Sequence, residues 1–248
     1  MEPKSGIKSP RATPSAAKGA GRSKTAKDGT KTRGASGSLN GTRTRDSEVI
    51  EAAVRIFWQK GYASASVQDV ADALGMLKGS LYYYIDSKES LLFKIFEDSH
   101  DALMKLTEQA VGSEGRAVDR LTRFLHGYAM WTLMHLERAA LYSREWRYAS
   151  DTHRATLSEQ QRYYDRTLRT LIIAGQEEGD LDATVDPRRA SLFIWAAFTG
   201  LPDWFRSGAK SEAEQVAATY VDLALRACGG APFLPPPPKP ARARTRSR

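Results

Sequence analysis

The fold is decided by one contiguous stretch, Ser66-Val-Gln-Asp-Val-Ala-Asp-Ala-Leu-Gly75-Met-Leu-Lys-Gly-Ser80-Leu-Tyr-Tyr-Tyr-Ile85. Its apolar spacing predicts a short helix that follows Ser66 and ends at Gly75, and a second helix over roughly Lys78–Ile85. Glycine at the junction permits a left-handed backbone and hence a tight turn. The small Ala71 lets the second helix cross close to the first. Two short helices joined in this way form a helix-turn-helix, whose second helix enters the major groove of DNA.

The outer face of the second helix carries groups that suit DNA. Leu81 and Ile85 are four residues apart and face inward. The residues left outside include a lysine and a glycine at the helix start and exposed tyrosines, which can contact phosphates, the DNA backbone or thymine methyls. With two positions on the preceding helix and one after the motif, the predicted DNA contacts are Ser66, Gln68, Lys78, Gly79, Ser80, Tyr82, Tyr83, Tyr84 and Lys88. The alternative is that the three tyrosines pack the small domain and that the lysine is a solvated charge.

Helical periodicity continues on both sides of this motif. The predicted caps, each a Ser or Asp before an apolar run, are Asp46 or Ser47, then Ser87, Asp186 before Pro187, and Ser211 in a capping box with Glu214. No segment alternates as a strand does, and no internal repeat is present. We therefore expect an all-α protein of about nine helices.

Charge is distributed unevenly along the 248 residues, which carry 37 Lys and Arg against 29 Asp and Glu, a net charge of +8. Residues 1–43 hold ten basic and two acidic side chains, and residues 230–248 hold five basic and no acidic ones. Both ends are poor in core-forming residues, so we expect them to be disordered. The predicted organisation is a basic tail (1–43), a DNA-binding domain (44–96), a second helical domain (97–229) and a Pro/Arg-rich tail (230–248).

Several other classes of protein are disfavoured. The single Cys228 allows no internal disulfide, and the apolar run Ser191–Leu201 is about half the length of a bilayer span. No histidine pair has metal-ligand spacing, and no phosphate-binding loop, Rossmann glycine pattern or nucleophile elbow occurs. The N-terminus lacks the apolar core of a secretory signal. We expect a cytoplasmic protein that is not an enzyme and holds no metal or cofactor.

A combined pattern extends over about fifty residues around the motif. Its positions are Ile50, Ala53, Phe57, Gly61-Tyr62, Val67, Asp69-Val70-Ala71, Gly75, Lys78-Gly79-Ser80-Leu81-Tyr82 and Ser87-Lys88-Glu89-Ser90-Leu91-Leu92. In this pattern, residues 47–96 resemble the DNA-binding domain of the TetR family of bacterial transcriptional repressors. Two positions depart from it: Leu77 stands where Ser or Thr usually caps the recognition helix, and Tyr84 where His is common. The resemblance implies a homodimer that represses transcription, binds a palindromic double-stranded operator in the bacterial nucleoid, and is released by a small-molecule effector bound to residues 97–229.

A second set of matches lies further along the chain, at Arg144-Glu145-Trp146-Arg147, Ala174–Gly179, Asp186-Pro187-Arg188 and Trp204-Phe205-Arg206. Together with residues 82–89, it resembles the branch of steroid- and lipid-catabolism regulators that respond to coenzyme A thioesters. The resemblance implies an aromatic cavity with arginines at its mouth. The predicted effector-binding residues are Trp131, His135, Arg144, Trp146, Arg147, Phe193, Trp195, Phe198, Trp204 and Arg206. Each aromatic could equally be core, and Arg144 and Arg147 could be surface ion-pair partners of Glu145 or Asp151.

Two C-terminal segments carry apolar or small residues that a partner helix would cover better than water does. The predicted dimer-interface residues are Leu192, Ala213, Val216, Ala217, Tyr220 and Ala224. A symmetric interface of this kind would place two recognition helices about 34–36 Å apart, as successive major grooves require. The alternative function is a non-specific architectural DNA-binding protein driven by its basic tails.

Overall fold

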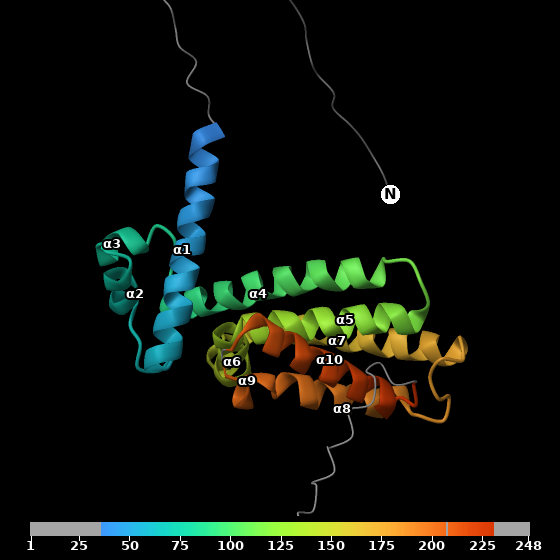
Figure 1. Ribbon diagram of the computed structural model, residues 1–248. Coiled ribbons are helices and arrows are strands. Elements are labelled where there is room, and N and C mark those ends of the chain that lie inside the picture. The colour runs from blue at the N-terminus through green and yellow to red at the C-terminus, as the bar shows by residue number, and fades with distance from the viewer. Residues whose placement is uncertain (1–35, 207, 231–248) are drawn as a thin grey trace, which may run out of the picture.

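The computed structural model describes residues 36–206 and 208–230. In these ranges the chain forms ten α-helices, one 3-10 helix and no strand, which confirms the all-α prediction. In chain order they are α1 (Ser36–Lys60), α2 (Val67–Ala73), α3 (Lys78–Leu81), α4 (Lys88–Val111), α5 (Ala117–Met134), α6 (Leu136–Glu145), η1 (Trp146–Tyr148), α7 (Asp151–Glu177), α8 (Pro187–Thr199), α9 (Leu201–Trp204) and α10 (Lys210–Ala227). Figure 1 shows α1–α3 grouped at one end of α4, with α5, α7, α8 and α10 stacked along it. No helix of this part of the chain is long and apolar enough to span a membrane.

The helix-turn-helix has the predicted glycine turn, and its first helix follows Ser66 as predicted. Ser66 caps α2 through a reciprocal capping box with Asp69, and Gly75 takes a φ of +63° between α2 and α3. Leu81 and Ile85 are both buried in the core that α1, α2 and α4 enclose. Because these anchors fix α3, the residues on its outer side have a defined position.

The second helix of the motif is shorter than predicted. α3 ends at Leu81, and the backbone continues in tighter turns, with Tyr83 N–H donating to the Ser80 carbonyl at 3.3 Å and Tyr84 N–H to the Leu81 carbonyl at 2.9 Å. These bonds span three residues rather than four. Ile85 is nevertheless buried, because the turns lead the chain back to the domain core.

The first helix is longer than predicted. α1 begins at Ser36, so Asp46 and Ser47 lie inside it and neither is its N-cap. Once packing fixes the later turns of a helix, extending it costs much less than nucleating a new one. An ion pair of 2.6 Å between Arg45 and Glu48 stabilises the helix near its entry to the core. The predicted disorder of residues 36–43 is therefore wrong, and the tail predictions for 1–35 and 231–248 lie outside the described residues.

The second core surrounds α5, which packs against α4, α7 and α10. Two predicted caps at its edges are confirmed: Ser87 caps α4, and Asp186 caps α8 directly before Pro187. Ser211 is not a cap, because Ala209 takes the extended backbone that a cap requires and α10 starts one residue later, at Lys210. The apolar run Ser191–Leu201 is divided at Gly200 between α8 and α9.

Helix α4 belongs to both cores. Its first half buries Leu91, Leu92, Ile95 and Phe96 in the helix-turn-helix domain, and its second half buries Leu103 and Ala110 in the larger domain. The predicted domain boundary at residue 96 thus falls inside a continuous helix. Because α4 is continuous, a shift of its second half in the larger domain would also move its first half, which packs in the helix-turn-helix domain.

Candidate nucleic-acid interface and ligand cavity

The outer side of α3 and of the turns that follow it is a small exposed surface formed by Lys78, Gly79, Tyr82 and Tyr83, here called the α3 surface. Tyr83 is 89% exposed and Tyr82 47% exposed, and Lys78 is also exposed. A Cβ built at Gly79 would meet no atom within 4 Å, so another backbone can approach there. A large aromatic ring left in water contributes little to folding. Its position is better explained by contact with a partner.

Two predicted DNA-contact residues at the edge of the α3 surface are less exposed than those on it. Tyr84 and Ser80 are half-buried, Tyr84 packs on the domain core, and its carbonyl accepts a hydrogen bond from Lys94. Leu77, which precedes α3, is 80% exposed and gives the helix no side-chain cap. The packing alternative thus describes Tyr84 and not Tyr83.

Ser66 and Gln68 lie at the start of α2, and both are exposed. The Ser66 hydroxyl donates to Asp69 Oδ2 at 2.7 Å and accepts from the Asp69 N–H at 3.2 Å. Gln68 Nε2 donates to Asp72 Oδ1 at 2.6 Å. Hydrogen bonds from Lys60 and then from Ser66 lower the pKa of Asp69 to about 2, so the cap persists in all but strong acid. Ser66 therefore has a structural role, and contacts of Ser66 and Gln68 with DNA stay predictions.

Lys88 points into the domain. Its Nζ donates to the carbonyls of Ala63 at 3.2 Å and Ala65 at 2.7 Å, and lies 4.4 Å from the centroid of the Tyr62 ring. These neighbours engage the ammonium group on the inner side of α4. This side chain ties the loop before α2 to the first turn of α4, and a contact of Lys88 with a phosphate stays a prediction.

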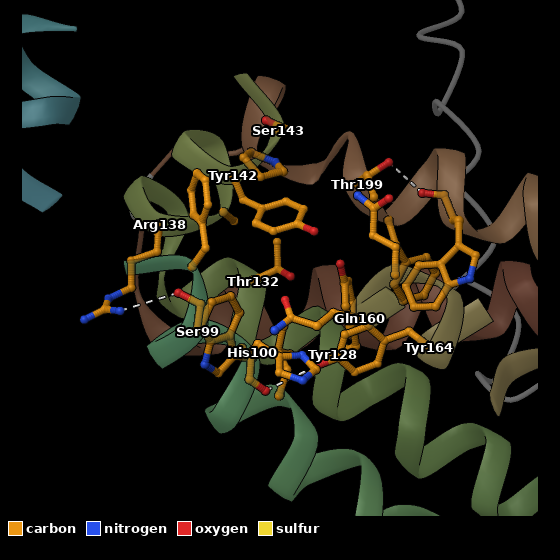
Figure 2. Close-up of a pocket in the computed structure, with 18 of the residues that line it drawn as sticks. Ser99, His100, Tyr128, Thr132, Arg138, Tyr142, Ser143, Gln160, Tyr164 and Thr199 are labelled. Atoms are coloured by element: carbon orange, nitrogen blue, oxygen red, sulfur yellow. Dashed lines mark hydrogen bonds between the residues drawn. The ribbon is translucent and has the colours of Figure 1, made fainter. Parts of the chain in front are cut away.

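A cavity of about 310 Å³ lies in the second domain, enclosed by residues of α4 to α9 (Figure 2). Three predicted effector residues line it: Trp131, Trp195 and Phe198. Lining residues that the sequence did not suggest, and whose side chains can form hydrogen bonds, are Ser99, His100, Tyr128, Thr132, Arg138, Tyr142, Ser143, Gln160, Gln161, Tyr164, Asp165 and Thr199. They come from separate helices, so no local spacing singles them out.

Seven predicted effector residues do not line this cavity: His135, Arg144, Trp146, Arg147, Phe193, Trp204 and Arg206. Arg144 pairs with Asp203 at 3.1 Å and lies over the ring of Trp58 at 5.4 Å. Trp204 donates its indole N–H to the hydroxyl of Tyr220 at 3.1 Å. The predicted arginines thus do not line this cavity: Arg144 pairs with Asp203, and Arg147 lies 4.0 Å from Glu145.

Three tyrosines and one histidine of the cavity wall favour their uncharged forms. Burial raises the pKa of Tyr128, Tyr142 and Tyr164, and burial lowers the pKa of His100. The hydroxyl of Tyr164 lies 2.7 Å from His100 Nδ1. Apart from Arg138 and Asp165, which are ion-paired, the polar groups on this largely aromatic wall are neutral, which suits an apolar ligand with a few polar atoms.

The predicted dimer stripe on α10 is mostly internal. Ala213, Ala217 and Ala224 are buried within the chain, because their small side chains let α10 pack closely on α5. The prediction that they contact a partner is therefore wrong. Val216 and Tyr220 are half-buried, packed at the edge of the same core.

An exposed apolar surface remains on these two helices. Leu192 and Phe193 of α8 are 60% and 61% exposed, and Leu223 of α10 is 56% exposed. Large aliphatic and aromatic side chains at this level of exposure commonly mark an interaction surface. Of the predicted interface residues, Leu192 is the one that keeps a largely exposed side chain.

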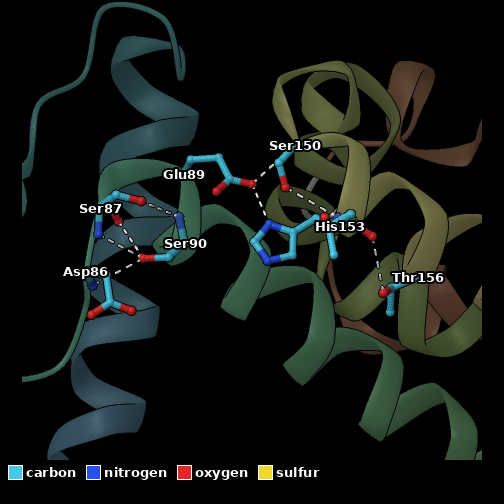
Figure 3. Close-up of polar contacts among 8 residues, drawn as sticks. Asp86, Ser87, Glu89, Ser90, Ser150, His153 and Thr156 are labelled. Atoms are coloured by element: carbon cyan, nitrogen blue, oxygen red, sulfur yellow. Dashed lines mark hydrogen bonds and ion pairs between the residues drawn. The ribbon is translucent and has the colours of Figure 1, made fainter.

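The two domains also meet where α4 and α7 begin. Figure 3 shows Glu89 extending from the first turn of α4 toward Ser150 and His153. Glu89 Oε1 accepts hydrogen bonds from His153 Nδ1 at 2.5 Å and from the Ser150 N–H at 3.1 Å, and the His153 ring stacks on Phe93 with centroids 3.7 Å apart. Burial raises the pKa of Glu89, but the hydrogen bonds from His153 and Ser150 outweigh it and the pKa is lowered.

Comparisons with known proteins agree with this architecture. Residues 49–95 match the bacterial regulatory proteins of the tetR family, and residues 114–228 match the tetracyclin repressor-like C-terminal domain. The HTH-type transcriptional repressor KstR2 of Rhodococcus jostii RHA1 is 28% identical over 194 residues, covering 75% of this chain and 92% of that protein.

Solved structures show the same fold. A bacterial regulatory protein of the tetR family from Rhodococcus RHA1 is 30% identical, with a TM-score of 0.69, and the match covers 75% of this chain and 97% of that one. AibR, solved in complex with isovaleryl coenzyme A and operator DNA, is 23% identical with a TM-score of 0.65, and the match covers 72% of this chain and 97% of that one.

Proposed function

Because the chain belongs to the TetR family of bacterial transcriptional regulators, we propose that it represses transcription by binding a palindromic operator as a dimer, and that a small molecule in the cavity releases it. The observation that carries this proposal is the α3 surface: Lys78 on α3, and Tyr82 and Tyr83 on the turns that follow it, stand exposed beside the buried anchor Leu81. The chain's similarity to repressors supports this reading over that of an architectural protein driven by its tails.

The proposed DNA contacts are few and local. Lys78 supplies charge to a phosphate, Gly79 allows close backbone approach, and the rings and hydroxyls of Tyr82 and Tyr83 contact sugars, phosphates or base edges. Dimerisation through the exposed apolar side chains of α8 and α10 would give the two α3 surfaces the spacing of about 34–36 Å that successive major grooves require.

The proposed effector is an acyl-coenzyme A thioester whose acyl group enters the cavity. Two facts support this class: the similarity to AibR, which was solved with isovaleryl coenzyme A, and the largely apolar lining of the cavity. Among the residues that line the cavity, Arg138 carries the cationic side chain, and it is already paired with Glu51 and Asp98. The phosphates of the coenzyme would therefore stay outside.

Selection of bound sequences from a random DNA pool tests the first part of the proposal. We expect enrichment of a palindrome with two half-sites about one helical turn apart. Absence of any enriched sequence would contradict specific repression.

A panel of acyl-coenzyme A esters, each compared with its free acid, tests the second part. We expect thioesters with apolar acyl groups to release the operator at lower concentration than the acids do. Release by the acids alone would contradict the proposed effector class.

A further inference from the structure

The guanidinium of Arg138 joins three helices beside the cavity. It belongs to α6, is 8% exposed, and donates from Nη2 to Glu51 Oε1 of α1 at 2.7 Å. Its Nη1 donates to Asp98 Oδ2 of α4 at 2.8 Å and lies 3.4 Å from Ser99 Oγ. A guanidinium keeps its charge in a protein interior, so a buried one needs partners of this kind.

Arg138 also lies beside two cavities. It lines the 310 Å³ cavity, yet Figure 2 shows its guanidinium turned away from the centre of that cavity, toward Ser99. Arg138 also lines a second, more open pocket of about 280 Å³, together with Glu51, Val54 and residues 133–137. The first turn of α6 therefore borders both the ligand cavity and this second pocket.

A second polar contact between the domains, that of Glu89 with His153, lies away from the ligand cavity. Glu89 and His153 join α4 to α7, but neither residue lines the ligand cavity. A ligand would touch the Arg138 side chain itself, whereas it could reach the Glu89 contact only through intervening residues. The Arg138 network is thus the shorter route from the cavity to the DNA-binding domain.

We propose that Arg138 is the positioning residue through which occupation of the cavity reaches the DNA-binding domain. Its bonds to Glu51 and Asp98 hold α1, α4 and α6 in one arrangement, and a ligand that displaces the first turn of α6 shifts Arg138 away from Glu51. The Arg138 guanidinium is buried although both carboxylates are half-exposed, so it keeps its charge inside the protein only while a carboxylate partner is in reach. This inference rests on the proposed function, since it explains how the operator is released.

A cavity-filling cycle tests the proposal without an identified ligand. Ala139 lines the cavity next to Arg138, so Ala139→Trp fills it from α6. Operator affinity is measured for four full-length proteins: wild type, Ala139→Trp, Glu51→Gln and the double variant. We expect Ala139→Trp to weaken operator binding by about tenfold or more, and by less than about threefold when Glu51→Gln is present.

Glu97→Gln is the matched control, because Glu97 is an exposed carboxylate next to Asp98 on α4 and its loss changes the charge equally. In this background Ala139→Trp should keep its full effect. Glu51 is 55% exposed, so Glu51→Gln should leave the fold intact, and Ala139→Leu repeats the cycle if tryptophan prevents folding.

The outcomes separate the two proposals. If the wild type binds no palindromic operator, the proposed function fails. If it binds one, and filling the cavity has no effect or has the same effect with and without the Glu51 carboxylate, the role of Arg138 is overturned while the operator function stands.

Discussion

The α3 surface and the ligand cavity differ in how many residues each would use to contact its partner, DNA or a small molecule. The first consists of a few exposed side chains on one short segment, held from behind by Leu81 and Ile85. The second is an enclosed space whose walls come from α4 to α9. A small exposed surface concentrates recognition in single residues, whereas an enclosed cavity spreads it over many. Single substitutions should therefore be severe at α3 and mild in the cavity.

The largest effect should come from the α3 surface. We expect Lys78→Ala combined with Tyr83→Ala to weaken operator binding by about 100-fold, since one base or phosphate contact contributes about 1–3 kcal/mol. The thermal midpoint should not change, because both side chains are exposed. Lys105→Ala, which removes an exposed lysine from α4, is the control in the same anisotropy titration. If the double variant lost less than threefold in operator affinity, the claim that recognition is concentrated in the α3 surface would be contradicted.

A second test concerns a lysine close to the α3 surface that the structure assigns to folding. Lys88→Met removes an ammonium group bonded to two backbone carbonyls. We expect a loss of about 1–3 kcal/mol of stability in chemical denaturation, because those carbonyls lose a charged donor. The dependence of operator affinity on salt should keep its slope. If the slope of log affinity against log salt concentration became shallower by about 0.9 in the variant, Lys88 would instead be a phosphate contact.

Within the cavity, one polar atom should matter much less. Tyr128→Phe removes a hydroxyl from a wall that offers many other groups, so the effector concentration for half-maximal operator release should change by less than about fivefold. Trp131→Phe, which removes an indole from the same wall, should behave similarly. A hundredfold change in either variant would show that the cavity, like α3, depends on single residues.

The smallest effect is expected at the contact between the domains. The pKa of Glu89 is lowered in the folded chain, so its stabilising contribution is complete above the unfolded value of about 4.5 and is lost as the pH falls through the lowered pKa. Glu89→Gln should therefore flatten the acid limb of a plot of stability against pH and leave the neutral region with a small, constant loss. An unchanged acid limb would mean that the carboxylate contributes nothing.

The same contrast explains what the sequence could predict. The helix-turn-helix is local: its caps, its glycine turn and its two inward residues lie within one stretch of twenty residues, so their spacing is readable. The structural contacts of Lys88 were not predicted, because its carbonyl partners lie on the chain before α2, 23 and 25 residues away. A lysine in the first turn of a helix gives no local sign of such a partner.

The cavity was less predictable because it is assembled from distant segments. Trp195 and Phe198 lie on the inner side of α8 and were identified, but Phe193 on the same helix faces outward at 61% exposure. Apolar residues that line a cavity have the same periodicity as those that fill a core. The stripe on α10 was misassigned for a related reason, since a row of alanines fits a helix of the same chain as well as one of a partner.

The central claim is that specificity lies in the α3 surface and not in the basic ends of the chain. The ratio of affinities for the palindromic operator and for a scrambled duplex, measured at one salt concentration, tests it most directly. Removal of residues 1–35 should weaken binding to both duplexes and preserve the ratio, because those charges contact phosphates regardless of sequence. Tyr83→Ala should bring the ratio close to one. A ratio that survives Tyr83→Ala but collapses when residues 1–35 are removed would contradict the account.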